Sequence, residues 1–207
     1  MTPTILTAAL LQELDRALER IDAPITGLWR PGLTDAEMDA LTEPIGIQLP
    51  AEARTWWAWH DGVTYDPQTR LAATLGDGWE VPPLSDAVED AIRARDLSAQ
   101  IAAKSPPGEF DEWRDSWITF VGVEPPERLA CECAPREGEA APVVHYDPMF
   151  NLTPSNYKAA SMGDVVTVWL QAIDDGTWHI DPDTGRFAWM DPVALAKAKG
   201  EDIAALL

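Results

Sequence analysis

The stretch from Leu33 to Gly62 constrains the fold of this chain most strongly, because it signals where two helices begin and end. Thr34 and Glu37 stand three positions apart and predict a capping box, in which each side chain accepts a backbone N–H at the start of a helix. Gly46 predicts the end of that helix, since glycine readily takes a positive φ. Pro50 suits the first position of a second helix. The stretch therefore predicts two helices joined by a tight corner.

The second helix is predicted to have one apolar face. This face consists of Ala53, Trp56, Trp57 and His60, which recur at i, i+3, i+4 and i+7. Gly62 is expected to end the helix. We interpret His60 as a core or capping histidine, rather than as a catalytic base, because of its place at the end of this apolar face.

The helical pair resembles the signature of the SUKH superfamily, named for its Syd, herpesviral and yeast cell-wall-regulator members. The matching motifs are Leu33-Thr34-x-x-Glu37, Gly46-Ile47-x-Leu49-Pro50 and Trp56-x-x-x-His60-Asp61-Gly62. The resemblance implies that this protein acts by binding other proteins. Bacterial members of the superfamily look mainly like immunity proteins, which neutralise a cognate polymorphic toxin that is often a nuclease or a deaminase.

The remaining elements are predicted in an order that agrees with this family. Helices are expected at residues 5–21, at 86–103 with Ser85 as the cap, and at 161–173 with Val165, Val168, Trp169 and Ala172 on the inner side. Strands are expected at 71–75, 79–81, 117–121, 129–133 and 143–147, followed by a hairpin at 177–190 and a terminal helix beginning at Asp191.

These elements predict an α+β fold. Residues 1–175 are expected to form a domain in which N-terminal helices pack on one side of a mainly antiparallel central sheet. Residues 176–207 are expected to add the C-terminal hairpin and helix, packed on the same domain.

The net charge of −20 limits the possible partners. Acidic residues exceed basic ones in every part of the chain, so the protein should repel nucleic acid and anionic membranes. The excess acid serves either solubility alone or attraction to a basic protein. The first 30 residues lack a signal-peptide pattern. Cys131 and Cys133 are only two positions apart, and a disulfide between them could not stabilise a secreted fold of this size. We therefore expect a cytoplasmic protein with reduced thiols.

Two clusters of residues are candidate sites of chemistry. Cys131 or Cys133 could join His145 and Asp147 in a nucleophilic set, although no spacing places them together. His179, Asp181 and Asp183 are a metal-like cluster, but an Asp-Pro-Asp-Thr-Gly run is also an ordinary hairpin turn. Catalytic motifs such as Gly-x-Ser-x-Gly and His-Glu-x-x-His are absent from the sequence. We expect no enzyme activity, no cofactor and no bound metal.

Candidate partner-binding residues combine exposed tryptophan with acid. Trp59 lies off the predicted apolar face, beside Asp61, and is either an exposed anchor for a basic partner or packed on the first helix or a loop. Further candidates of the same kind are Trp79, Glu80, Glu109, Asp111 and Glu112.

Three functions follow from these features. The resemblance and the charge favour an immunity protein that binds a basic toxin. The alternative is a regulatory scaffold that acts through protein partners in cell-wall or secretion processes. A metal-dependent hydrolase that uses the His179 cluster is a weaker alternative.

Overall fold

The computed structural model describes most of the chain, and the fold is given for that part. The described residues are 2–64, 74–76, 78–104, 113–122, 127–134, 140–146 and 157–190. The predicted terminal helix at 191–207 lies outside them.

The described residues form helices, one larger sheet and two short strand pairs. The α-helices are α1 (Ala8–Arg20), α2 (Asp35–Thr42), α3 (Ala51–Trp59), α4 (Leu84–Ala102) and α5 (Met162–Asp175). The larger sheet contains β3 (Thr74–Leu75), β4 (Trp79–Glu80), β5 (Trp117–Gly122), β6 (Arg128–Glu132), β7 (Val143–Tyr146) and β8 (Tyr157–Ala159). The short pairs are β1 (Trp29–Pro31) with β2 (His60–Val63), and β9 (Trp178–Ile180) with β10 (Phe187–Trp189).

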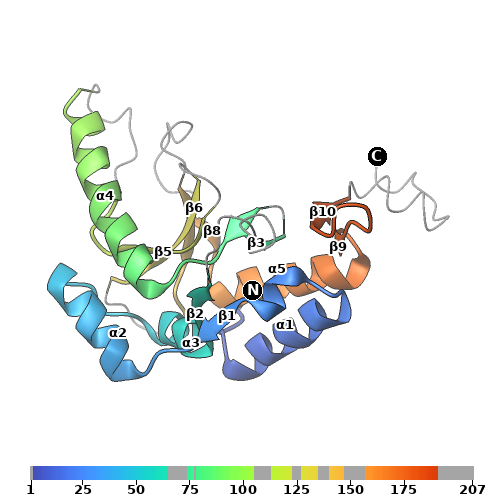
Figure 1. Ribbon diagram of the computed structural model, residues 1–207. Helices are drawn as coiled ribbons and strands as arrows, with labels where there is room; N and C mark the ends of the chain where they lie inside the picture. Colours follow the sequence, from blue (N-terminus) through green and yellow to red (C-terminus); the bar gives the residue numbers. More distant parts are fainter. Residues whose placement is uncertain are drawn as a thin grey trace.

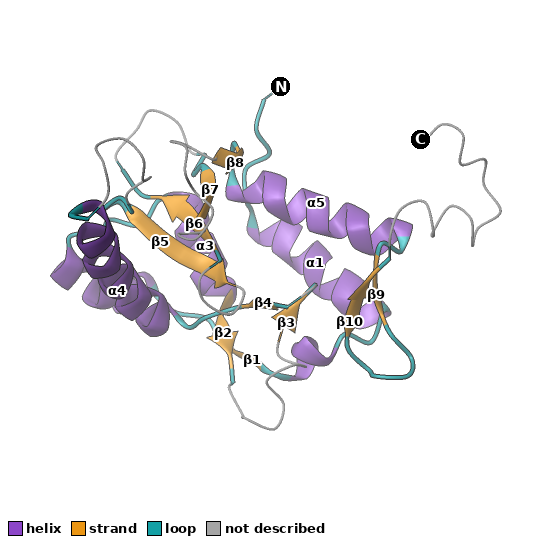
Figure 2. Cartoon of the chain, turned by 90° about the horizontal axis from the view of Figure 1, so that it is seen from above, coloured by secondary structure: helices purple, strands orange, loops and turns teal. Residues whose placement is uncertain are grey.

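The central sheet lies between two helical layers (Figures 1 and 2). Its strands follow the order β3-β4-β5-β6-β7-β8, and every neighbouring pair is antiparallel. Helix α4 covers one face, whereas α1, α3 and α5 lie on the other side. The predicted α+β class and the antiparallel sheet are confirmed.

Both faces of the sheet are apolar, and the described residues form two core clusters. Alternate residues of β7 illustrate this: Val143 belongs to the main core on the side of α1, α3 and α5, whereas Val144 and Tyr146 belong to the smaller core beneath α4. The register shifts between Thr119 and Val121, which is typical of a β-bulge.

Several predictions from local signals are confirmed. Thr34 and Glu37 form the capping box, in which the Thr34 N–H donates to Glu37 Oε2 at 2.8 Å. Gly46 has the left-handed φ expected of it, 71°, but it caps the 3₁₀ helix η2 (Glu43–Ile45) that follows α2, and α2 itself ends earlier, at Thr42. The β9–β10 hairpin forms where the sequence predicts it, and its Trp178 and Phe187 pack against the main core.

Other predictions are wrong in detail. Helix α3 ends at Trp59, and His60 begins β2, so His60 does not lie on the apolar face of the helix. Ser85 does not cap α4, which begins at Leu84 after Pro83. Val168 was expected on the inner side of α5, but its side chain is 63% exposed. The predicted Val165 and Trp169 are buried, and Met162, Gly163, Val166, Leu170 and Ile173 complete the buried face of α5.

A buried carboxylate connects three segments that are distant in the sequence. Glu52 is fully buried, and its oxygens accept the backbone N–H groups of Leu6, Ala141 and Gly163. These bonds provide hydrogen-bond donors for the buried carboxylate oxygens. Glu52 thereby joins the N-terminal segment, the approach to β7 and the start of α5.

Candidate partner-binding site

Trp59 packs against neighbouring side chains and is not fully exposed to solvent. Its indole Nε1 donates to Asp15 Oδ2 of α1 at 2.7 Å, and its ring centroid lies 4.9 Å from that of Trp29 and 4.4 Å from that of His60. Of the two interpretations of Trp59, packing on the first helix is the one observed. Its half-buried indole leaves only part of the ring available to a partner.

Asp61, the second partner-binding candidate, is buried. Only 4% of Asp61 is accessible, and its Oδ1 accepts the Leu84 N–H at 2.8 Å. Asp61 is therefore the side chain that caps α4, and it also pairs with Arg30 at 3.0 Å. This role belongs to the fold rather than to a binding surface.

The surroundings of Asp61 disfavour its charge. Burial raises the pKa of Asp61 above its ordinary value, and the bond from Leu84 and the charge of Arg30 offset this effect only in part. Removal of water from a carboxylate stabilises its protonated form.

Trp79 and Glu80 are adjacent in β4, and their side chains line separate hollows. Trp79 lines an apolar groove, whereas Glu80 lines a polar hollow beside α4. Successive side chains of a strand point to opposite faces, which explains the separation. The two predicted residues therefore do not form one site.

The groove beside Trp79 is lined mainly by apolar and aromatic side chains. We call it the aromatic groove, and define it by Trp79, Leu129, His145, Val168, Trp169 and Trp178. Its volume is about 460 Å³, and Asp164, Val165 and Ala159 complete its lining. This volume lies within the range of roughly 300–1,000 Å³ that is common for ligand pockets.

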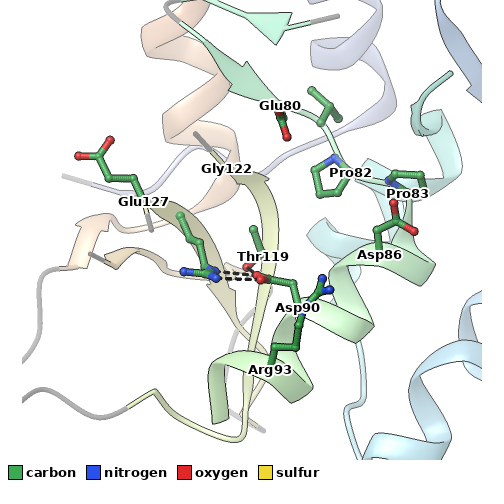
Figure 3. A pocket seen from close by; sticks show the side chains of 11 residues that line it. Glu80, Pro82, Pro83, Asp86, Asp90, Arg93, Thr119, Gly122 and Glu127 are labelled. Carbon is green, nitrogen blue, oxygen red and sulfur yellow. Dashed lines mark hydrogen bonds and ion pairs between the residues drawn. The ribbon is translucent and has the colours of Figure 1, made fainter. Parts of the chain in front are cut away.

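The polar hollow lies where α4 meets β4, β5 and β6 (Figure 3). Its Asp90 accepts two bonds from the Arg128 guanidinium, at 2.7 and 2.8 Å, and one from the Thr119 hydroxyl at 2.8 Å. Arg128 and Thr119 therefore satisfy the Asp90 carboxylate within the fold. The hollow has a volume of about 240 Å³, and Glu80, Asp86 and Glu127 also line it.

The remaining partner candidates are Glu109, Asp111 and Glu112, which lie outside the described residues.

The aromatic groove was only partly predicted from the sequence. Trp79 was identified from its acidic neighbour, but Trp169 and Val168 were assigned to the inner side of α5. Helical spacing puts Val168 on the same stripe as Val165 and Trp169, so the sequence pattern does not distinguish the exposed Val168 from its buried neighbours.

The cluster of His179, Asp181 and Asp183 belongs to the β9–β10 hairpin. Asp181 accepts the N–H groups of Asp183 and Thr184, as expected for the hairpin turn, and these bonds lower the pKa of Asp181. Among the described residues, no three side chains of His, Cys, Asp or Glu are grouped so that they could hold a metal ion.

The proposed nucleophilic set is not assembled by the described residues. Leu129, rather than Cys131, stands opposite His145 in the sheet, and Asp147 lies outside the described part of the chain. Cys131 and Cys133 are free thiols with sulfur atoms 3.8 Å apart in the core. Their mutual hydrogen bond and burial raise the pKa of Cys131 well above its ordinary value.

Comparison with known proteins adds no family assignment. A scan against protein-family models and a search of curated proteins both found no match. In the described part of the chain, every helix is too short or too polar to cross a lipid bilayer.

Proposed function

We propose that this chain is a non-catalytic immunity protein that binds a basic toxin domain in the cytoplasm and covers its active cleft. The observation that carries the proposal is the net charge of −20. A nuclease or deaminase toxin that handles nucleic acid is usually basic, and an acidic protein complements it electrostatically.

The placement of the acids supports a broad electrostatic surface. Exposed carboxylates occur on four helices: Glu13 and Glu19 of α1, Asp35, Glu37 and Asp39 of α2, Asp86, Glu89 and Asp96 of α4, and Asp174 and Asp175 of α5. A surface of one sign attracts an oppositely charged protein before contact and increases the association rate. The resemblance of the helical pair to the SUKH signature favours the same function.

Co-expression tests the proposal. The probe is the C-terminal toxin domain encoded beside the gene for this chain, expressed from an inducible promoter in a bacterial host. We expect the chain to restore growth, whereas an unrelated acidic protein of similar size and charge should not. Absence of rescue with every adjacent toxin domain would contradict the proposal.

A further inference from the structure

Among the described residues, the aromatic groove leaves apolar surface exposed. Val168 is 63% exposed at its edge, and the half-buried Trp79 and Trp178 line its walls. Contiguous apolar surface exposed to water is uncommon in soluble proteins and often marks an interaction site. The groove can therefore bury an apolar side chain of another molecule.

The walls of the groove are positioned by packing. Trp178 stacks on Trp169 with ring centroids 6.1 Å apart, and the rings of Trp79 and His145 form a T-shaped pair with centroids 6.3 Å apart. Gly76 lies behind Trp178, where an added Cβ would come within 2.4 Å of the indole. A site that is already formed loses little conformational entropy when it binds.

The charged groups at the groove are acidic. Asp164 lines it, and the carboxylate of Glu127, a residue of the polar hollow, lies 3.7 Å from Nε2 of the groove residue His145. Lysine and arginine are absent from the described lining. A neighbouring positive charge on the occupant would be attracted, and a negative charge would be repelled.

We propose that the aromatic groove receives an apolar side chain flanked by lysine or arginine from the basic protein partner. This inference rests on the proposed function, because that function supplies a basic partner. It specifies the part of the surface that makes the central apolar contact, while the distributed acids attract the partner. An apolar anchor in a pocket with a charged rim is the usual arrangement of a binding hot spot.

Three short peptides test the groove without the toxin. They are acetylated and amidated pentapeptides of sequence Lys-Lys-Trp-Lys-Lys, Lys-Lys-Ala-Lys-Lys and Glu-Glu-Trp-Glu-Glu. Binding is followed through the Val168 methyl and tryptophan indole signals in NMR titrations. We expect the first peptide to perturb the groove signals and to bind about tenfold more tightly than either of the others.

A matched pair of variants assigns the binding to the groove. Val168→Arg places a positive charge at the groove, and Leu97→Arg makes the same change on α4, where Leu97 is 46% exposed. We expect Val168→Arg to weaken Lys-Lys-Trp-Lys-Lys binding about tenfold and Leu97→Arg to leave it unchanged. Because both side chains are exposed, the two variants should unfold at the temperature of the wild type.

Several results would overturn the proposal. These are equal binding of the tryptophan and alanine peptides, equal binding of the lysine and glutamate peptides, and unchanged binding by Val168→Arg. A wild-type dimer that Val168→Arg converts to a monomer would assign the groove to a second copy instead. Toxin neutralisation without peptide binding at the groove would reject this inference alone, whereas groove binding without toxin neutralisation would reject the proposed function.

Discussion

At the scale of single residues, Asp61 has a structural role that the sequence pattern does not predict. Its carboxylate caps α4 through the Leu84 N–H, so Asp61→Ala leaves that donor without its side-chain acceptor. We expect this variant to lose about 1–2 kcal/mol of unfolding free energy. Asp61→Asn keeps an acceptor oxygen without the buried charge, and should match or exceed the wild-type stability at neutral pH. Chemical denaturation measures both.

The pH dependence of stability, compared between Asp61→Asn and the wild type, tests whether the buried charge of Asp61 is the cause. The pKa of Asp61 is raised in the folded protein, so the folded state binds this proton more tightly than the unfolded chain. The contribution of Asp61 to stability is therefore greatest at acidic pH and decreases as pH rises through its folded pKa. The stability of Asp61→Asn relative to the wild type should increase between about pH 4 and pH 7. A decrease would mean that the ion pair with Arg30 dominates.

At the scale of elements, the short strand β2 positions α4. It pairs with β1, its Val63 N–H donates to Val81 O at 3.3 Å, and its Asp61 caps the helix. Gly62 permits this close approach, because its φ is 72° and a Cβ would lie 2.4 Å from Pro83 N.

Gly62→Ala should therefore disrupt this junction. It combines an unfavourable backbone conformation with a backbone clash, and we expect a loss of about 3 kcal/mol or more in unfolding free energy. Gly27→Ala is the matched control, since a Cβ there meets nothing within 4 Å. Thermal or chemical denaturation compares the two. Equal stability of both variants would contradict the proposed close approach.

At the scale of the whole molecule, local sequence signals predict the helices and strands better than the tertiary contacts between them. Thr34 and Glu37 are close in sequence, and the capping box that they predict is observed. Asp61 and Glu52 instead find partners in distant segments, as far away as 111 residues for the bond from Gly163. Sequence spacing does not specify which distant segments meet, so these roles were missed. The sequence does carry one signal for the burial of Glu52: it lies four positions before Trp56, and therefore on the apolar face of α3.

The distributed charge also belongs to the whole molecule, because no single element carries it. The measurement that tests its role most directly is the dissociation constant of the complex with the adjacent toxin domain, in about 50 mM and about 500 mM NaCl. We predict specific binding that weakens about tenfold or more at the higher salt concentration, mainly through slower association. Absence of binding at low salt, or an affinity independent of salt, would contradict recognition of a basic toxin by this acidic protein.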